Sequence, residues 1–107
     1  PPADDATFLR RATLDLTGRT PAPAAAAAFL ADPAPDKRAK LVDRLVTSPE
    51  FARHVAEVWH NLLLPLNEDR TRVYHEPLLG WLEAGVRDGR GWDETVAALL
   101  TLSLIHI

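Results

Sequence analysis

The sequence SPEFARHVAEVWHNLLL, residues 48–64, has the pattern of one long amphipathic helix. Ser48 can cap its first turn, Pro49 suits the first helical position, and Pro65 ends the helix. The large apolar residues recur at helical spacing and predict one buried stripe: Phe51, Val55, Val58, Trp59, Leu62 and Leu63. The solvent-facing arc is then predicted to hold Arg53, His54, Glu57, His60 and Asn61. Such a stripe must be covered by neighbouring helices.

The residues before this stretch predict three shorter helices. The first is capped by Asp4 or Asp5, runs to about Leu16 and ends before Gly18. Thr20-Pro21 is predicted to open the second, which ends before the prolines at 33 and 35. The third runs from 35 or 36 to 46. Its predicted apolar stripe is Leu41, Val42, Leu45 and Val46, and its predicted solvated side is Lys37, Arg38, Lys40, Asp43 and Arg44.

The residues after it predict a loop and two further helices. Residues 66–75 have no helical period and are predicted to form a loop. A helix over 77–88 has Leu78, Leu82 and Val86 as its spine, and Gly80 and Gly85 each weaken it by about 1 kcal/mol relative to Ala. The last helix is capped by Asp93, with Val96, Ala97, Leu99 and Leu100 predicted inside.

Together these elements predict an all-α fold, an irregular array of five or six short helices around the central helix at about 48–64. We expect residues 1–102 to be a single helical domain that is truncated at its C-terminus, because the last helix is apolar on more than half its surface. Residues 103–107, SLIHI, resemble the translated read-through of a sequencing adapter in metagenomic assemblies and are interpreted as a non-native tail.

The composition excludes several classes of protein. With a net charge of −3 and no basic patch, nucleic-acid binding is disfavoured. The chain has no Cys, which excludes disulfides, thiolate metal sites and a covalent c-type haem within it. No apolar run reaches the roughly 18–20 residues of a membrane span. We therefore expect no nucleic-acid partner, no membrane span and no cofactor in this chain.

Histidines raise the question of a metal site. His54 and His60 are six residues apart and so lie on different sides of a helix, whereas zinc-binding pairs on one helix are three or four apart. His75 lies in the predicted loop and His106 in the suspected tail. Surface histidines without a metal are the preferred interpretation, with His60 and His75 kept as candidates for a polar site.

Arg11, Asp15 and Arg19 form a second candidate site, with Arg10 beside them. The arginines could bind an anion or a phosphate. The preferred alternative is an Arg–Asp ion pair, because Asp15 supplies the opposite charge. No GxSxG, P-loop or dinucleotide motif occurs, and the acidic residues have no spacing that fixes two carboxylates across a substrate. Whether the chain catalyses any reaction stays open.

A family resemblance rests on several motifs in order. FLRRATLDLTGRTP at 8–21 and KLVDRLVTSPEFARHVAEVW at 40–59 resemble the planctomycete cytochrome-associated domain of unknown function, of the PSCyt type. The segment from Gly80 to Leu100 is similar to the family's later Trp-containing pattern. The resemblance covers only the N-terminal part of such a domain. It implies an exported protein, in the periplasm or at the cell surface, and it supplies no catalytic residue.

Two functions follow as hypotheses. The first is a non-catalytic helical module of an exported multidomain protein, associated with cytochrome-c-like electron-transfer domains and packed against neighbouring domains of the same polypeptide. The second is part of a polysaccharide-directed hydrolase, whose site lies in a missing C-terminal part or in the 66–76 loop.

Overall fold

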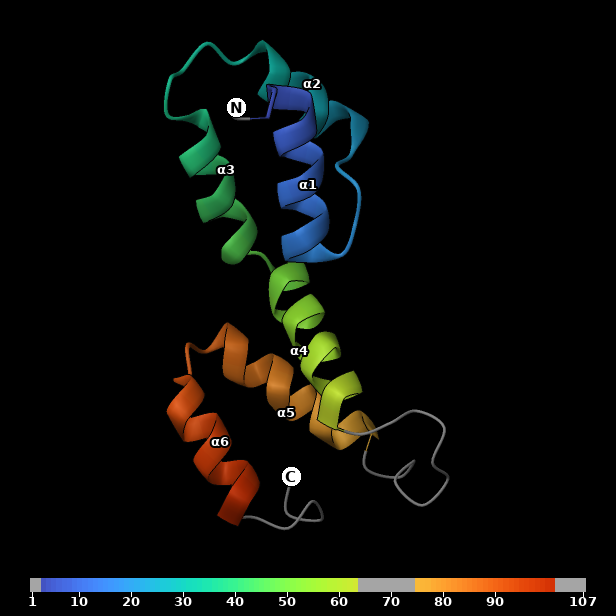
Figure 1. The fold of residues 1–107 in the computed structure, drawn as a ribbon, viewed down its shortest axis with the longest axis vertical. Helices are drawn as coiled ribbons and strands as arrows, with labels where there is room; N and C mark the ends of the chain where they lie inside the picture. Colours follow the sequence, from blue (N-terminus) through green and yellow to red (C-terminus); the bar gives the residue numbers. More distant parts are fainter. Residues whose placement is uncertain (1–2, 64–74, 102–107) are drawn as a thin grey trace. The chain divides into compact units, whose positions relative to one another are not determined.

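The computed structural model describes residues 3–63 and 75–101, and within these ranges the chain forms six helices and no strand (Figure 1). The helices are α1 (Asp5–Thr17), α2 (Pro23–Ala31), α3 (Lys37–Val46), α4 (Pro49–Leu63), α5 (His75–Arg87) and α6 (Trp92–Thr101). The all-α prediction is confirmed. The predictions for Pro65, for the loop up to residue 74 and for the tail lie outside the described residues.

Contacts divide the chain into two units, Pro1–Phe51 and Ala52–Ile107, with the boundary inside α4. In the first unit, local signals set the ends of α1. The Asp4 carboxylate accepts a hydrogen bond from the Thr7 N–H at 2.7 Å, and Gly18 takes the left-handed conformation with φ of 72°, as predicted. The predicted start of α2 at Thr20-Pro21 is wrong. Pro23 keeps the preceding Ala22 extended, so the helix begins at Pro23.

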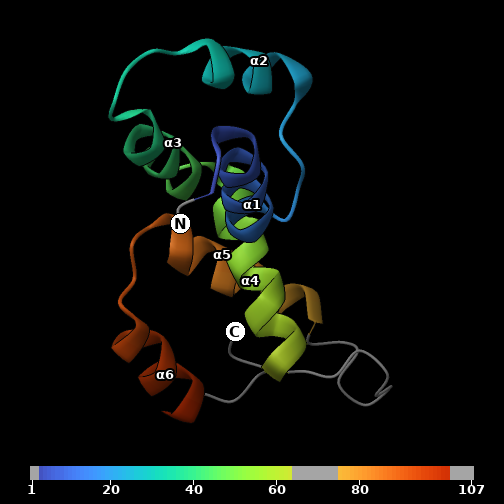
Figure 2. The same cartoon turned by 45° about the horizontal axis from the view of Figure 1, so that its top comes forward.

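The core of the first unit joins its three helices. Leu9 of α1, Phe29 of α2 and Leu41 of α3 are buried against one another. Figure 2 shows α1 and α3 side by side, with α2 near both. Phe29 is the only fully buried residue of α2. Ala26 packs half-buried against the same core, and the remaining residues, mostly alanines, are exposed. The packing of α2 therefore centres on one aromatic side chain.

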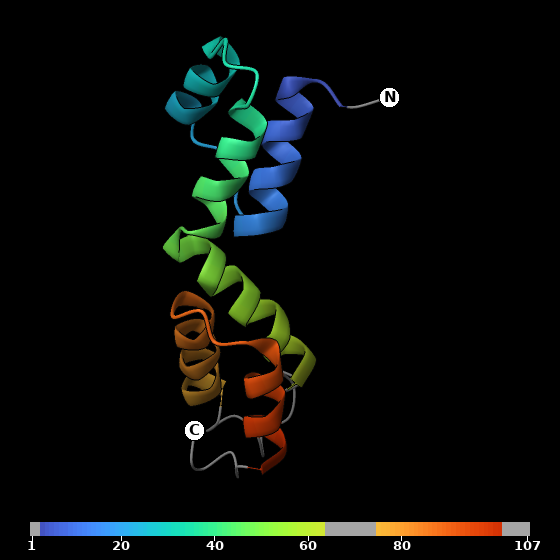
Figure 3. The ribbon, with the colours of Figure 1, turned by 90° about the vertical axis from the view of Figure 1, so that its left-hand side faces the viewer.

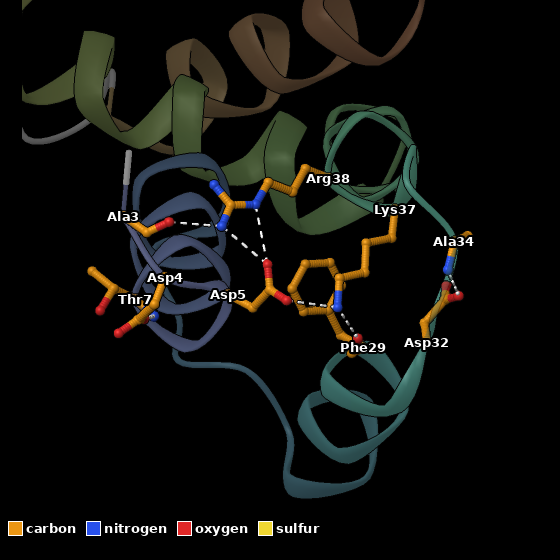
Figure 4. Close-up of polar contacts among 9 residues, drawn as sticks. All are labelled: Ala3, Asp4, Asp5, Thr7, Phe29, Asp32, Ala34, Lys37 and Arg38. Atoms are coloured by element: carbon orange, nitrogen blue, oxygen red, sulfur yellow. Dashed lines mark hydrogen bonds and ion pairs between the residues drawn. The ribbon is translucent and has the colours of Figure 1, made fainter. Parts of the chain in front are cut away.

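An ionic network at Asp5 holds the first unit together (Figure 4). The Asp5 carboxylate pairs with Lys37 Nζ at 2.8 Å and with the Arg38 guanidinium at 3.0 Å. Hydrogen bonds from Lys37 and Arg38 hold the pKa of Asp5 below its ordinary value of 3.8. Lys37 also donates to the Phe29 carbonyl and lies over the Phe29 ring. The prediction that Lys37 and Arg38 are solvated is therefore wrong, because a carboxylate 33 residues away recruits Arg38.

In the second unit, α4 buries a different face from the one predicted. Its buried residues are Ala52, Ala56 and His60. Val58, Leu62 and Leu63 of the predicted stripe are exposed, and Phe51, Val55 and Trp59 are half-buried. The physical reason is close approach: Ala56 is completely buried against Leu78, Leu79 and Leu82 of α5, which a large side chain at 56 would keep at a distance.

The core of the second unit is built mainly from three leucines of α5, Leu78, Leu79 and Leu82. The predicted spine of Leu78 and Leu82 is part of it. A short connector joins the end of α5 to the start of α6 (Figure 3), and Gly89 within it has φ of 77°. α6 contributes buried Thr95 and partly buried Leu99. The prediction that Val96, Ala97 and Leu100 lie inside is wrong, since all three are exposed and Leu100 is 82% exposed. The predicted cap at Asp93 is also wrong, because the helix already begins at Trp92.

Arg90 lies over the face of Trp81 and against α5. Its guanidinium carbon is 4.3 Å from the centre of the Trp81 ring, and its backbone N–H donates to the Gly85 carbonyl at 2.8 Å. A Cβ atom at residue 85 would lie 2.7 Å from Arg90 Nη1. A side chain at position 85 would thus displace the Arg90 guanidinium, whereas a Cβ at Gly80 would meet nothing within 4 Å.

Candidate functional site

A cavity of about 510 Å³ lies within the first unit, among α1, the connector to α2, α2, α3 and the first turn of α4. Its floor is apolar and includes the core residues Leu9, Phe29 and Leu41. The space exists because α2 presents small side chains, Ala25 and Ala28, along one wall. The volume lies inside the range of roughly 300–1,000 Å³ typical of small-molecule sites.

Charged groups line this cavity as well as apolar ones. Arg19, one of the candidates from the sequence, is among them, and Arg44 of α3 is another. Among the described residues, neither guanidinium takes part in an ion pair. Asp32 and Glu50 supply two carboxylates. One Asp32 oxygen accepts the Ala34 N–H at 2.9 Å (Figure 4), so that carboxylate is engaged in its own turn.

Arg11 and Asp15 lie apart from the cavity lining, on the exposed side of α1. The preferred interpretation predicted an ion pair between them, and the ion pairs found within residues 3–63 and 75–101 do not include it. Of the three candidates near α1, the structure therefore brings only Arg19 to this cavity, which Arg44 also lines.

His60 and His75 meet in the second unit, although 15 residues separate them. Nε2 of His60 lies 2.8 Å from Nδ1 of His75, and the ring centres are 4.7 Å apart. His60 is only 5% exposed. Its prediction as a surface histidine is wrong, because α4 turns the Ala52–Ala56–His60 face towards α5. His75 is the first residue of α5 rather than part of the predicted loop.

Hydrogen-bond partners assign the protons of this pair. Asn61 Oδ1 lies 3.4 Å from Nδ1 of His60 and can only accept, so this contact is satisfied in the tautomer that carries a proton on that nitrogen. Nε2 of His60 is then the acceptor, and Nδ1–H of His75 is the donor. Nε2 of His75 is buried and has no hydrogen-bond partner in the described part of the chain. In this arrangement one hydrogen bond runs from His75 to His60.

Sequence reasoning could not find these partnerships. Arg44 occupies a position that periodicity assigns to the solvated side of α3, and nothing local links it to Arg19. The spacing of His54 and His60 on one helix argues against a shared site, but the relevant partner of His60 lies on another helix. The signal that could have indicated a buried His60 is its i, i+4 spacing from Ala52 and Ala56, two small residues that permit close helix packing.

Two properties of the described residues bear on membrane and metal binding. None of the helices described is long and apolar enough to cross a membrane. Within residues 3–63 and 75–101, no group of three or more His, Asp and Glu side chains is placed to hold a metal ion.

Comparison with known proteins places the chain in a family. A family model described as PSCyt2, protein of unknown function (DUF1549), matches residues 1–106. Searches of curated proteins and of solved structures found no match. The motifs at 8–21 and 40–59, whose residues also line the cavity, lie within the matched range. Because the match spans nearly the whole chain, the resemblance inferred from the sequence is confirmed, and the chain belongs to the PSCyt2 family of proteins of unknown function.

Proposed function

We propose that this chain is a non-catalytic helical module of an exported multidomain protein, where it packs against neighbouring domains of the same polypeptide. Cytochrome-c-like electron-transfer domains are the proposed neighbours, and the periplasm or the cell surface is the proposed location. Support for these neighbours and this location comes from the sequence resemblance alone. The packing role has a separate, structural support in the second unit.

The observation that carries the packing role is a set of exposed aliphatic side chains. Leu100 of α6 is 82% exposed, Leu62 of α4 is 68% exposed, and Val58 is 45% exposed. Full burial of one such side chain contributes about 1.5–3 kcal/mol. A neighbouring domain that covers these side chains would gain this free energy, which is what a packing role requires.

A photo-crosslinking experiment on the whole polypeptide tests this role. The photoreactive residue p-benzoylphenylalanine replaces Leu100, and in a matched control it replaces Glu94, an exposed polar residue of the same helix. We expect crosslinks from position 100 to a neighbouring domain, identified by mass spectrometry, and few from position 94. Equal labelling from both positions, or crosslinks from 100 only within residues 1–107, would contradict the proposal.

The export of the polypeptide has its own test. Fractionation of cells that express it with its own leader should place it in the periplasmic or surface fraction. Recovery with the cytoplasmic marker enzymes would refute the proposed location without affecting the packing role.

A further inference from the structure

We infer that the cavity of the first unit binds a monoanionic ligand that joins a carboxylate to an aliphatic body, of the size of a medium-chain fatty acid. This inference does not depend on the packing role, which concerns α4 and α6 of the second unit. It rests on the size of the cavity, the chemistry of its walls and the charge at its edge.

The walls favour an aliphatic body. Leu9, Phe29 and Leu41 form the floor, and the cavity side of α2 adds Ala25 and Ala28. No polar group of these side chains needs a partner, so an alkyl chain can displace water from them without leaving a donor or acceptor unsatisfied. Each methylene group removed from water contributes about 0.8 kcal/mol. A ligand with a body of several methylene groups gains the most from such a lining.

The two arginines favour a carboxylate. Arg19 lies in the connector after α1 and Arg44 in the last turn of α3, and both residues line the same cavity. Neither is in an ion pair among the described residues. A guanidinium presents paired N–H donors that match the two oxygens of a carboxylate. The cavity therefore offers charge complementarity to a ligand anion.

The two acidic residues limit the charge of that anion. Asp32 is engaged with the Ala34 N–H, and Glu50 lies in the first turn of α4, where the helix dipole stabilises its charge. With two carboxylates in the lining, a dianion such as a phosphate monoester meets more repulsion than a monoanion does. The hydroxyl group of Thr20 provides a further donor without adding charge, whereas the Thr17 hydroxyl already donates to the Thr13 carbonyl at 2.6 Å.

Titration calorimetry of the whole chain with decanoate tests the inference, with decanol as the neutral control and decyl phosphate as the dianionic one. We expect saturable binding of decanoate that is at least about tenfold tighter than binding of either control ligand. Arg19→Gln and Arg44→Gln should each weaken decanoate binding by about tenfold or more, because each removes a charge-assisted hydrogen bond. Arg10→Gln, an exposed change outside the lining, should leave it unchanged.

A second pair of variants tests the place of binding. Ala25→Leu introduces three carbons into the cavity wall and should abolish binding, whereas Ala27→Leu changes an exposed residue of the same helix that does not line the cavity. Circular dichroism confirms that each variant keeps its helices. Absence of saturable binding, equal affinity for decanol, or equal effects of the two leucine variants would each overturn the inference.

Discussion

The hydrogen bond between His60 and His75 leads to a prediction about the stability of the second unit. His60→Leu replaces a buried imidazole by an aliphatic side chain of similar size, so little volume is lost. It leaves the Nδ1–H of His75 without its acceptor, which lay 2.8 Å away. A buried donor left unsatisfied costs about 1–3 kcal/mol, and we expect a loss in this range. His75→Leu should cost a similar amount, because it leaves Nε2 of His60 without a donor.

The double variant distinguishes this hydrogen bond from simple packing. With both rings replaced, no polar group of the pair remains to be satisfied, and such replacements can be nearly neutral. The double variant should therefore lose less stability than the sum of the two single losses, by about 1 kcal/mol. Independent packing contributions would instead add to within about 0.3–0.5 kcal/mol.

Urea denaturation followed by tryptophan fluorescence is the suitable assay. All three tryptophans, at 59, 81 and 92, lie in the second unit, so the signal reports the unit that holds the histidine pair. Val58→Ala on the same helix serves as the control and should change stability by less than about 0.5 kcal/mol, as surface substitutions do, because Val58 is 45% exposed. Additive losses in the double variant, or a neutral His60→Leu, would refute the proposed hydrogen bond.

Three further predictions concern single residues. Gly80→Ala should stabilise α5 by about 0.5–1 kcal/mol, because the added methyl group meets open space. Gly85→Ala should gain less stability and should alter the Trp fluorescence, because its methyl group displaces Arg90. Equal gains of the two variants in thermal melts would contradict this. Leu78→Ala should destabilise the second unit by about 2–5 kcal/mol in the same urea assay, since Leu78 is 1% exposed; a loss under 1 kcal/mol would place it outside the core. The pKa of Asp5 is lowered in the folded first unit, so its ionised carboxylate stabilises the fold at pH values above 3.8, its ordinary pKa. This contribution is lost as the pH falls through the lower pKa of the folded state. Acid titrations followed by circular dichroism should therefore show a shallower loss of helix below pH 3.8 in Asp5→Asn than in the parent chain, and identical profiles would argue against the network.

Much of the helical framework could be predicted because its signals are local. Asp4 caps α1 and Gly18 ends it, Pro49 begins α4, and the prolines at 33 and 35 separate α2 from α3. Each of these signals acts through sterics or hydrogen bonds within a few residues, so the sequence alone contains the necessary information.

The buried faces could be predicted less well, because they depend on how closely helices approach. Periodicity gives weight to large apolar residues, and in α4 it pointed to Val58 and Leu62, both of which are exposed. The observed contact runs through Ala52 and Ala56, whose small size carries little weight in a hydrophobic pattern.

The candidate sites depend on contacts over long sequence separations. Arg19 and Arg44 line one cavity, and His60 meets His75, yet no local pattern connects the members of either pair. Arg19, His60 and His75 could be singled out from the sequence by residue type. Their partners could be found only once the helices were placed.

The dependence of α2 on one buried side chain has a consequence for the kinetics of the first unit. A nine-residue helix is shorter than the roughly 12–15 residues needed for marginal stability in isolation, so α2 persists only while Phe29 stays packed. Its amide protons should exchange with solvent deuterium through a sub-global opening that leaves α1 and α3 protected. Because α2 forms one wall of the cavity, the same opening would set how fast any occupant leaves, and a bound occupant should slow exchange in α2 more than in α1.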